Sequence, residues 1–294
     1  MYDDDLVFLK GTADFVRAGV AAGEAVLVAV PGDAIDTLRD ELGHVAERAG
    51  WIDITVTGRN PARIIPLWQD LLDENPGRPV RGVCQVVYAE RRPAELAEAL
   101  LHEALLNLAF EHATRFQLRC PYDARSTGRD ILAGLDRTHQ KLLNGAAYES
   151  TAFDPVRIAT GTFAAPLPRP PATAERRPVR PAELRAIREM VREAALRHGL
   201  GPSRADDLAL AAHEICENSR RFAGGGTLAV WTEGDTLLCE TSDSGRITAL
   251  MVGTTLPSPL ADGGRGLWLA NQLCDLVQIR SSVSGTTVRL HVVR

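Results

Sequence analysis

The chain has 294 residues, of which 45% are hydrophobic and 24% are charged, and its formal net charge is −5. This acidic balance argues against direct binding of nucleic acid, which needs a basic surface. No apolar run approaches the roughly 20 residues that cross a bilayer, and the acidic start MYDDDLVFLK does not resemble a signal peptide. We therefore expect a cytoplasmic protein with no membrane segment, long enough for two domains.

Short apolar runs alternate with helical patterns through residues 1–150. Strands are predicted at AVLVAVP (25–31), WIDITV (51–56), VRGVCQVVY (80–88) and RFQLRCPYD (115–123). The segments between them repeat their apolar residues at helical spacing, and the last, at 92–113, is a long amphipathic helix. Strands that are apolar throughout and alternate with helices are typical of a mostly parallel sheet covered on both faces. We therefore predict a three-layer α/β/α domain over residues 1–150.

Three features of this first part bear on its chemistry. The loop VPGDAID lacks the glycine-rich cradle and the lysine of a P-loop. His102 and Glu103 are neighbours on the long helix, an arrangement in which a histidine can accept a phosphoryl group, but a histidine packed inside a sheet domain is the simpler interpretation. The chain's five cysteines form no C-x-x-C pair, so we expect reduced, buried thiols rather than a structural zinc site.

Prolines dominate the middle of the chain. The stretch AAPLPRPPATAERRPVRP, residues 164–181, holds six of the 17 prolines and few apolar groups. Proline fixes φ and removes a backbone donor, which excludes a regular helix. We interpret residues 151–181 as a semi-extended linker to a second domain over residues 182–294.

The second domain begins with two helical patterns, at 181–200 and at 202–223, the latter with Ser203 as its N-cap. The predicted core stripe of this second helix consists of Leu208, Ala212, Ile215, Ser219 and Phe222. Two strand pairs follow: TLAVWTE and TLLCETSD meet at Gly234–Asp235, and a last pair meets around Ser284–Gly285.

Glu214 and Asn218 are four residues apart on the second helix, so they project from neighbouring positions on one face. A carboxylate and a carboxamide placed in this way can orient a hydroxyl group and hold a hard metal ion through oxygen. The helix by itself favours two solvated residues instead. The functional interpretation therefore depends on the segments that follow.

Three later segments suggest a nucleotide pocket. Asp243 ends a strand and can accept a hydrogen bond from an exocyclic amine, while Gly245 leaves room for a flat base. Residues 248–262 are polar and interrupted by glycine and proline, as in a mobile cover. The stretch Gly264–Gly266 opens an apolar helix, where exposed backbone N–H groups and the charge of Arg265 favour a phosphate.

In this order and spacing, residues 181–294 resemble the GHKL (Bergerat) ATPase family, specifically its anti-sigma-factor serine kinase branch. The resemblance implies a two-layer α/β sandwich with helices on one face of a largely antiparallel sheet. It also implies a site for ATP and Mg²⁺, with Glu214 as general base and Asn218 as Mg²⁺ ligand. The residues it implies around the nucleotide are Asp243 and Gly245 at the adenine, Gly264, Arg265, Gly266 and Leu267 at the phosphates, and Thr287 on the adenine side.

The first part is similar to the MEDS sensory domain, a class related to RecA-like nucleotide-binding folds without their P-loop. The resemblance is carried by GTADFVRAGVAAGEAVLVAVP, GRNPARIIPLWQDLLDENPGRPVRGV, RPAELAEALLHEALLNLAF and CPYDA. A MEDS domain joined to an ATPase of this branch is a familiar layout in actinobacterial regulatory proteins.

Together the resemblances imply a regulator that phosphorylates a serine or threonine of an anti-anti-sigma (STAS) partner, or sequesters a sigma factor, under sensory control. By analogy they also imply a homodimer. Two other interpretations stay open. Arg246 stands where many family members have a second glycine, which suits a non-catalytic nucleotide- or partner-binding switch. A histidine kinase is the third, but it needs a dimerising helical hairpin where this chain has its prolines.

Overall fold

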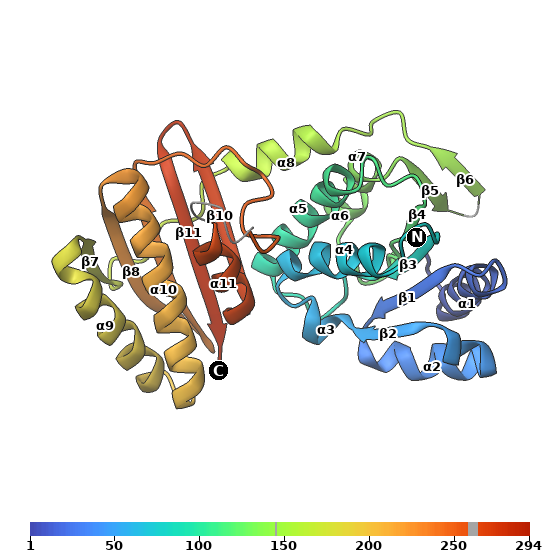
Figure 1. Cartoon of the computed structure of the whole chain (residues 1–294), viewed down its shortest axis with the longest axis horizontal. Coiled ribbons are helices and arrows are strands. Elements are labelled where there is room, and N and C mark those ends of the chain that lie inside the picture. The colour runs from blue at the N-terminus through green and yellow to red at the C-terminus, as the bar shows by residue number, and fades with distance from the viewer. Residues whose placement is uncertain (145, 258–263) are drawn as a thin grey trace. The chain divides into compact units, whose positions relative to one another are not determined.

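The computed structural model describes residues 1–144, 146–257 and 264–294. They divide into two compact units, Met1–Ile158 and Ala159–Arg294, and each unit has its own sheet and hydrophobic core (Figure 1). No helix among the described residues is both long and apolar enough to cross a membrane.

The main sheet of the first unit is parallel, with four strands in the order β2-β1-β3-β4. Its strands are β1 (Ala25–Val30), β2 (Gly50–Asp53), β3 (Val80–Cys84) and β4 (Phe116–Arg119). Every residue of β1 is buried, as expected of a central strand covered on both faces. The predicted parallel sheet is confirmed.

Helices cover both faces of this sheet. They are α1 (Asp5–Ala21), α2 (Gly32–Leu42), α3 (Ile54–Thr57), α4 (Ile64–Glu74) and α5 (Pro93–Ala109), with 3-10 turns η1 (Gly43–Arg48) and η2 (Pro61–Arg63). Helices α1 and α2 pack on the face that carries Val26, Val28 and Val30. On the opposite face, the ring of Trp68 from α4 lies so close to Gly82 of β3 that a Cβ atom there would come within 2.6 Å of it. The unit therefore has the predicted α/β/α layers.

Short elements complete the first unit: α6 (Arg129–Leu132), α7 (Leu135–Thr138) and a separate hairpin of β5 (Lys141–Asn144) and β6 (Ala146–Glu149). The strands predicted at 51–56 and 115–123 are shorter in the structure. The first ends at Asp53, because its carboxylate accepts a hydrogen bond of 2.9 Å from the Thr55 N–H and so begins α3.

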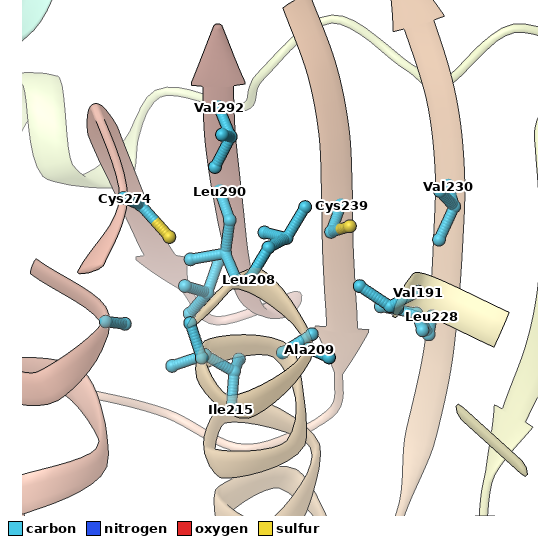
Figure 2. Packing of buried hydrophobic residues seen from close by; sticks show 14 of the residues in the cluster. Val191, Leu208, Ala209, Ile215, Leu228, Val230, Cys239, Cys274, Leu290 and Val292 are labelled. Carbon is cyan, nitrogen blue, oxygen red and sulfur yellow. The ribbon is translucent and has the colours of Figure 1, made fainter. Parts of the chain in front are cut away.

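The second unit is an antiparallel sheet of five strands in the order β10-β11-β9-β8-β7, with helices packed on one face. The strands are β7 (Glu175–Val179), β8 (Gly226–Glu233), β9 (Thr236–Asp243), β10 (Leu276–Ser282) and β11 (Gly285–Val293). The helical elements are η3 (Pro181–Glu183), α9 (Leu184–Arg197), α10 (Pro202–Ala223) and α11 (Arg265–Leu273). Figure 2 shows Leu208 and Ile215 of α10 among the sheet residues Val230, Cys239 and Leu290. This is the predicted two-layer α/β sandwich.

The segment predicted as a linker, residues 151–181, is more ordered than expected. It contains helix α8 (Pro155–Ala164) and strand β7, and Phe163 of α8 is buried in the core of the second unit. Strand β7 pairs with β8 at the edge of the sheet, which is the position where a strand tolerates a proline such as Pro178. Much of the segment is therefore part of the second fold rather than a free connection.

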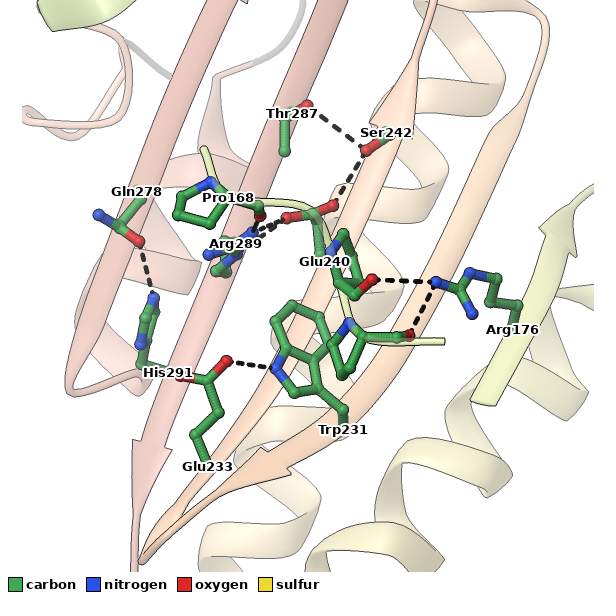
Figure 3. Close-up of polar contacts among 12 residues, drawn as sticks. Pro168, Arg176, Trp231, Glu233, Glu240, Ser242, Gln278, Thr287, Arg289 and His291 are labelled. Atoms are coloured by element: carbon green, nitrogen blue, oxygen red, sulfur yellow. Dashed lines mark hydrogen bonds and ion pairs between the residues drawn. The ribbon is translucent and has the colours of Figure 1, made fainter. Parts of the chain in front are cut away.

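The sheet face opposite the helices carries polar side chains, and the chain before β7 covers part of it (Figure 3). Arg289 on β11 forms an ion pair with Glu240 on β9, and both side chains are only 7% exposed. The Arg289 guanidinium also donates to the carbonyl oxygen of Pro168, and Ala174 packs with Trp231 in a small cluster on the same face. The proline-rich stretch before β7 therefore lies along the outer face of the sheet.

Two predicted details of α10 are wrong. Its N-cap is Gly201, followed by Pro202 at the first helical position, rather than Ser203. Phe222, predicted in the core stripe, is 62% exposed. Its ring lies against the Arg221 guanidinium, 5.2 Å from the ring centroid, instead of facing the core.

Candidate functional site

Helix α10 presents three polar side chains close together: Glu214, Asn218 and Ser219. Ser219 is buried, and the other two are half-buried. Glu217, on the same helix, accepts from Arg220 at 2.7 Å, and this guanidinium holds the pKa of the Glu217 carboxyl below its ordinary value. Glu214 has no such cation within the part of the chain that the structure describes, so its carboxylate is available to a ligand.

The start of α11 lies directly against this face of α10. A Cβ atom at Gly266 would lie 3.0 Å from Nδ2 of Asn218 and 3.1 Å from Oε2 of Glu214, so only a glycine leaves both side chains in place. Gly264, the N-cap of α11, has φ 86, a left-handed conformation that favours glycine. The predicted phosphate-binding backbone therefore touches the predicted base and metal ligand. Arg265 is exposed beside them.

Asp243, the last residue of β9, is held toward the same helix. Its Oδ2 accepts a hydrogen bond from the Ser219 hydroxyl, and its Oδ1 accepts one of 2.8 Å from the Gly245 N–H. A Cβ atom at Gly245 would lie 3.1 Å from the Cβ of Ala223 at the end of α10, so this turn is tight. A carboxylate has about four lone-pair positions. Two hydrogen bonds therefore leave Asp243 able to accept from the amine of a ligand.

The threonine on this side of the sheet is Thr286, not the predicted Thr287. Thr286 is the register partner of Asp243, and its hydroxyl donates to the carbonyl oxygen of Gly245 at 2.9 Å. Thr287 pairs with Ser242 and points to the outer face, where the two hydroxyls are 3.4 Å apart (Figure 3). Alternation along β11 puts adjacent residues on opposite faces, so the structure does not bring Thr287 to the other site residues.

The segment after β9, predicted as a mobile cover, is partly anchored. Gly253, with φ 75, packs against Leu267 of α11, and its carbonyl oxygen accepts a hydrogen bond of 2.8 Å from the Asn271 carboxamide. Leu267 itself is 5% exposed and belongs to the core, so it supports the first turn of α11 from behind. The part of the predicted cover at 258–262 lies outside the described residues.

The remaining predicted residues form two adjoining groups. Glu214 and Asn218 meet the start of α11, and Asp243 closes a turn with Gly245. The groups are joined through α10, because Asn218 approaches Gly266 while the next residue, Ser219, bonds to Asp243. Ser219 was expected only as a core residue. In the sequence, Ser219 is a single hydroxyl in an otherwise apolar stripe, and this indicates that its side chain makes a hydrogen bond in the core.

The side chains and backbone groups of this candidate site fit Mg·ATP. Carboxylate and carboxamide oxygens, as on Glu214 and Asn218, suit a hard cation. The bare backbone at Gly264 and Gly266 opens a helix, which suits a phosphate. Asp243 supplies an acceptor at the other end of the site, where a base amine would need one.

The structure does not favour His102 as a phosphoacceptor. Its side chain is 2% exposed, and neither ring nitrogen has a hydrogen-bond partner among the described residues. Burial lowers the pKa of His102 to about 4. His102 is therefore packed inside the domain, as the simpler interpretation of the sequence predicted. Its ring nitrogens, however, lack hydrogen-bond partners among the described residues.

Residues 1–140 match the family described as MEDS, the methanogen/methylotroph, DcmR sensory domain, and residues 177–292 match the family described as the histidine kinase-like ATPase domain. No curated protein matches the chain. A similar solved structure is that of the RsbU and RsbW domains of Rv1364c from Mycobacterium tuberculosis, with 21% sequence identity and a TM-score of 0.31. The match covers 42% of this chain and 33% of that one, so this chain spans about a third of its length.

Proposed function

We propose that this chain, which joins a MEDS sensory domain to a histidine kinase-like ATPase domain, binds Mg·ATP in its second unit and acts as a regulator of the anti-sigma-factor type. In this proposal it transfers a phosphoryl group to a serine or threonine of an anti-anti-sigma (STAS) partner, or it sequesters a sigma factor. The MEDS unit controls the second unit in response to a signal.

One observation carries the proposal: α10 joins the two groups of site residues. Its Asn218 lies next to Gly266 at the start of α11, and its Ser219 holds Asp243 at the end of β9. A nucleotide whose base lies at Asp243 would therefore extend its phosphates toward Gly266 along one stretch of one helix. The family motifs predicted this order, and the contacts are consistent with it.

Each side chain has a distinct role in this reaction. Glu214 accepts the proton of the attacking hydroxyl, because its carboxylate has no competing ion pair among the described residues. Asn218 holds Mg²⁺ through its carboxamide oxygen. Backbone N–H groups of Gly264–Gly266 and the charge of Arg265 orient the phosphates at the helix start. Mg·ATP supplies the phosphoryl group, with the cation neutralising part of its charge.

The test is phosphate transfer from Mg·ATP to purified STAS-domain proteins, with Glu214→Gln as the variant. We expect this variant to bind ATP but to transfer phosphate about 10²- to 10⁴-fold more slowly, since it loses a general base. Glu217→Gln is the matched control, because Glu217 lies on the same helix but is paired with Arg220. Equal loss in both variants, or no ATP binding by the wild type, would contradict the proposal.

A second candidate is a non-catalytic switch, and Arg246 favours it. Its side chain is exposed next to the Asp243–Gly245 turn, where it adds a charge close to the proposed adenine site. In this case ATP binding would persist without transfer, and Glu214→Gln would change neither. The same assay therefore separates the kinase from the switch.

A further inference from the structure

The first unit contains a cavity that the proposed phosphoryl transfer does not use. Its volume is about 1110 Å³, and every residue that lines it belongs to this unit. Apolar rings, including those of Phe8 and Phe15, form part of the wall. Three lining side chains with atoms that commonly bind metal ions lie close together: Glu103, Cys120 and His139.

The fold gathers these three side chains from separate elements. Glu103 lies on α5, Cys120 directly follows β4, and His139 directly follows α7. Their donor atoms all lie within 4.8 Å of one another, and Nε2 of His139 is 3.2 Å from Oε2 of Glu103. Ligands of one Zn²⁺, each bound at about 2.0–2.3 Å, are themselves about 3.3–3.8 Å apart. Small side-chain rotations therefore suffice to bring the three donors around one ion.

Nε2 is the nitrogen that His139 presents to this cluster. Its Nδ1 lies 3.2 Å from the carbonyl oxygen of Leu135 and 3.0 Å from the hydroxyl of Thr138. When Nδ1 donates to the carbonyl oxygen, Nε2 of the neutral ring can bind a metal ion beside Glu103. Metal-binding histidines commonly donate their second ring N–H to a carbonyl or carboxylate, which fixes the ring in this way.

Burial leaves the carboxylate of Glu103 short of partners. The side chain is 2% exposed, and its Oε1 has no hydrogen-bond partner in the described part of the chain. The hydroxyl of Tyr122, which also lines the cavity, interacts with this carboxylate. A buried carboxylate without compensating bonds is unfavourable. His139 contacts Oε2 at 3.2 Å, and a bound cation would complete the compensation of the carboxylate charge.

We propose that Glu103, Cys120 and His139 bind one divalent metal ion of the Zn²⁺ class in the wall of this cavity. Carboxylate, thiolate and imidazole together are a ligand set that Zn²⁺ and related ions accept. Three protein ligands leave one coordination position, and it faces the cavity, where water or a small donor ligand completes the site. The sequence gives no C-x-x-C signal, because the ligands lie at positions 103, 120 and 139 and meet only in the fold.

Cobalt provides the probe, since Co²⁺ takes zinc sites and a cobalt–thiolate bond absorbs strongly in the near ultraviolet. The full chain, freed of metal with a chelator, is titrated with CoCl₂ and then with ZnCl₂. We expect one Co²⁺ per chain with thiolate absorption, loss of that absorption on adding Zn²⁺, and a change in the visible bands on adding azide at the open position. No thiolate absorption in the wild type overturns the site, and no response to azide overturns its open position.

Variants then assign the ligands. Cys120→Ser should abolish the thiolate absorption, and His139→Gln should weaken Co²⁺ binding by at least about tenfold. Cys84→Ser is the control, because Cys84 is a buried cysteine on β3 outside the trio. Circular dichroism checks that each variant is folded. Persistence of the absorption in Cys120→Ser, or its loss in Cys84→Ser alone, overturns the assignment. The site lies in the first unit, so these results are independent of ATP binding in the second.

Discussion

At the scale of single residues, the alternation along β11 decides which threonine lies on the side of the proposed nucleotide site. Thr286 shares its face with Asp243 and with the core residues Val288 and Leu290, whereas Thr287 shares the outer face with Arg289. The apolar alternation along β11 already separates these two faces in the sequence. The family motif, which names a threonine without fixing its face, led to the neighbouring position.

Thr286→Val and Thr287→Val test this correction directly. Thr286→Val removes the hydrogen bond to the Gly245 carbonyl oxygen at the turn that positions Asp243. We expect it to weaken ATP binding about fivefold, the effect of one neutral hydrogen bond of about 1 kcal/mol. Thr287→Val should leave the affinity unchanged. Titration calorimetry of both variants checks this, and the reverse order would restore Thr287 to the site.

We expect protonation of His102 to lower the stability of the first unit in acid. Burial lowers its folded-state pKa to about 4 from the ordinary 6.5. Between these values the unfolded chain binds a proton that the folded chain does not, so stability is lost as pH falls below 6.5. At pH 5 the loss amounts to about 2 kcal/mol. We expect His102→Leu to lose correspondingly less stability than the wild type between pH 7 and pH 5 in urea denaturation, and an equal loss would contradict the assignment.

At the scale of elements, the site depends on the contact between α10 and the first turn of α11. Most elements follow from local patterns: the buried run of β1, the hairpin turn at Gly234 with φ 59, and the apolar stripe of α10. The pairing of β7 does not, because an edge strand reading ERRPV has neither alternation nor apolar bulk. The contacts of Gly266 and of Ser219 also depend on packing between elements distant in sequence, which local patterns do not specify.

Gly266→Ala tests the contact between the two helices. The added methyl would lie 3.0–3.1 Å from the ends of Asn218 and Glu214, and these side chains must shift to admit it. We expect phosphate transfer to fall about tenfold or more, since small displacements of catalytic groups are costly. Unfolding free energy should change by less than about 1 kcal/mol, because alanine is the better helix former. Gly161→Ala, where nothing lies within 4 Å, is the control and should transfer phosphate normally.

At the scale of the whole molecule, the two units keep separate sheets and cores, and the proline-rich stretch belongs to the second. It lies along the outer sheet face, where Arg289 binds both Glu240 and the carbonyl oxygen of Pro168. The sequence predicted the two folds and their order, because each has its own periodicity. Composition alone did not predict that this stretch docks on a sheet, since the polar contacts that hold it involve side chains far along the chain.

Arg289→Met tests how far this docking stabilises the second unit. It leaves the buried Glu240 carboxylate without its cation, and we expect a loss of about 3–5 kcal/mol in unfolding free energy. Arg192→Met is the control, since the Arg192–Asp206 pair is 45% and 57% exposed and should contribute less than about 1 kcal/mol. Urea denaturation of both variants measures the difference. Equal losses of unfolding free energy in the two variants would show that the buried pair stabilises the unit no more than the exposed pair does.

The most direct test of the central claim is calorimetric titration of the full chain with Mg·ATP, comparing the wild type with Asp243→Asn. The account predicts one nucleotide per chain, with affinity reduced about 10- to 100-fold by the loss of a charged acceptor. Asp235→Asn, at the exposed hairpin turn, should bind as the wild type does. Failure of the wild type to bind, or equal affinity in Asp243→Asn, would contradict the claim that this site binds ATP.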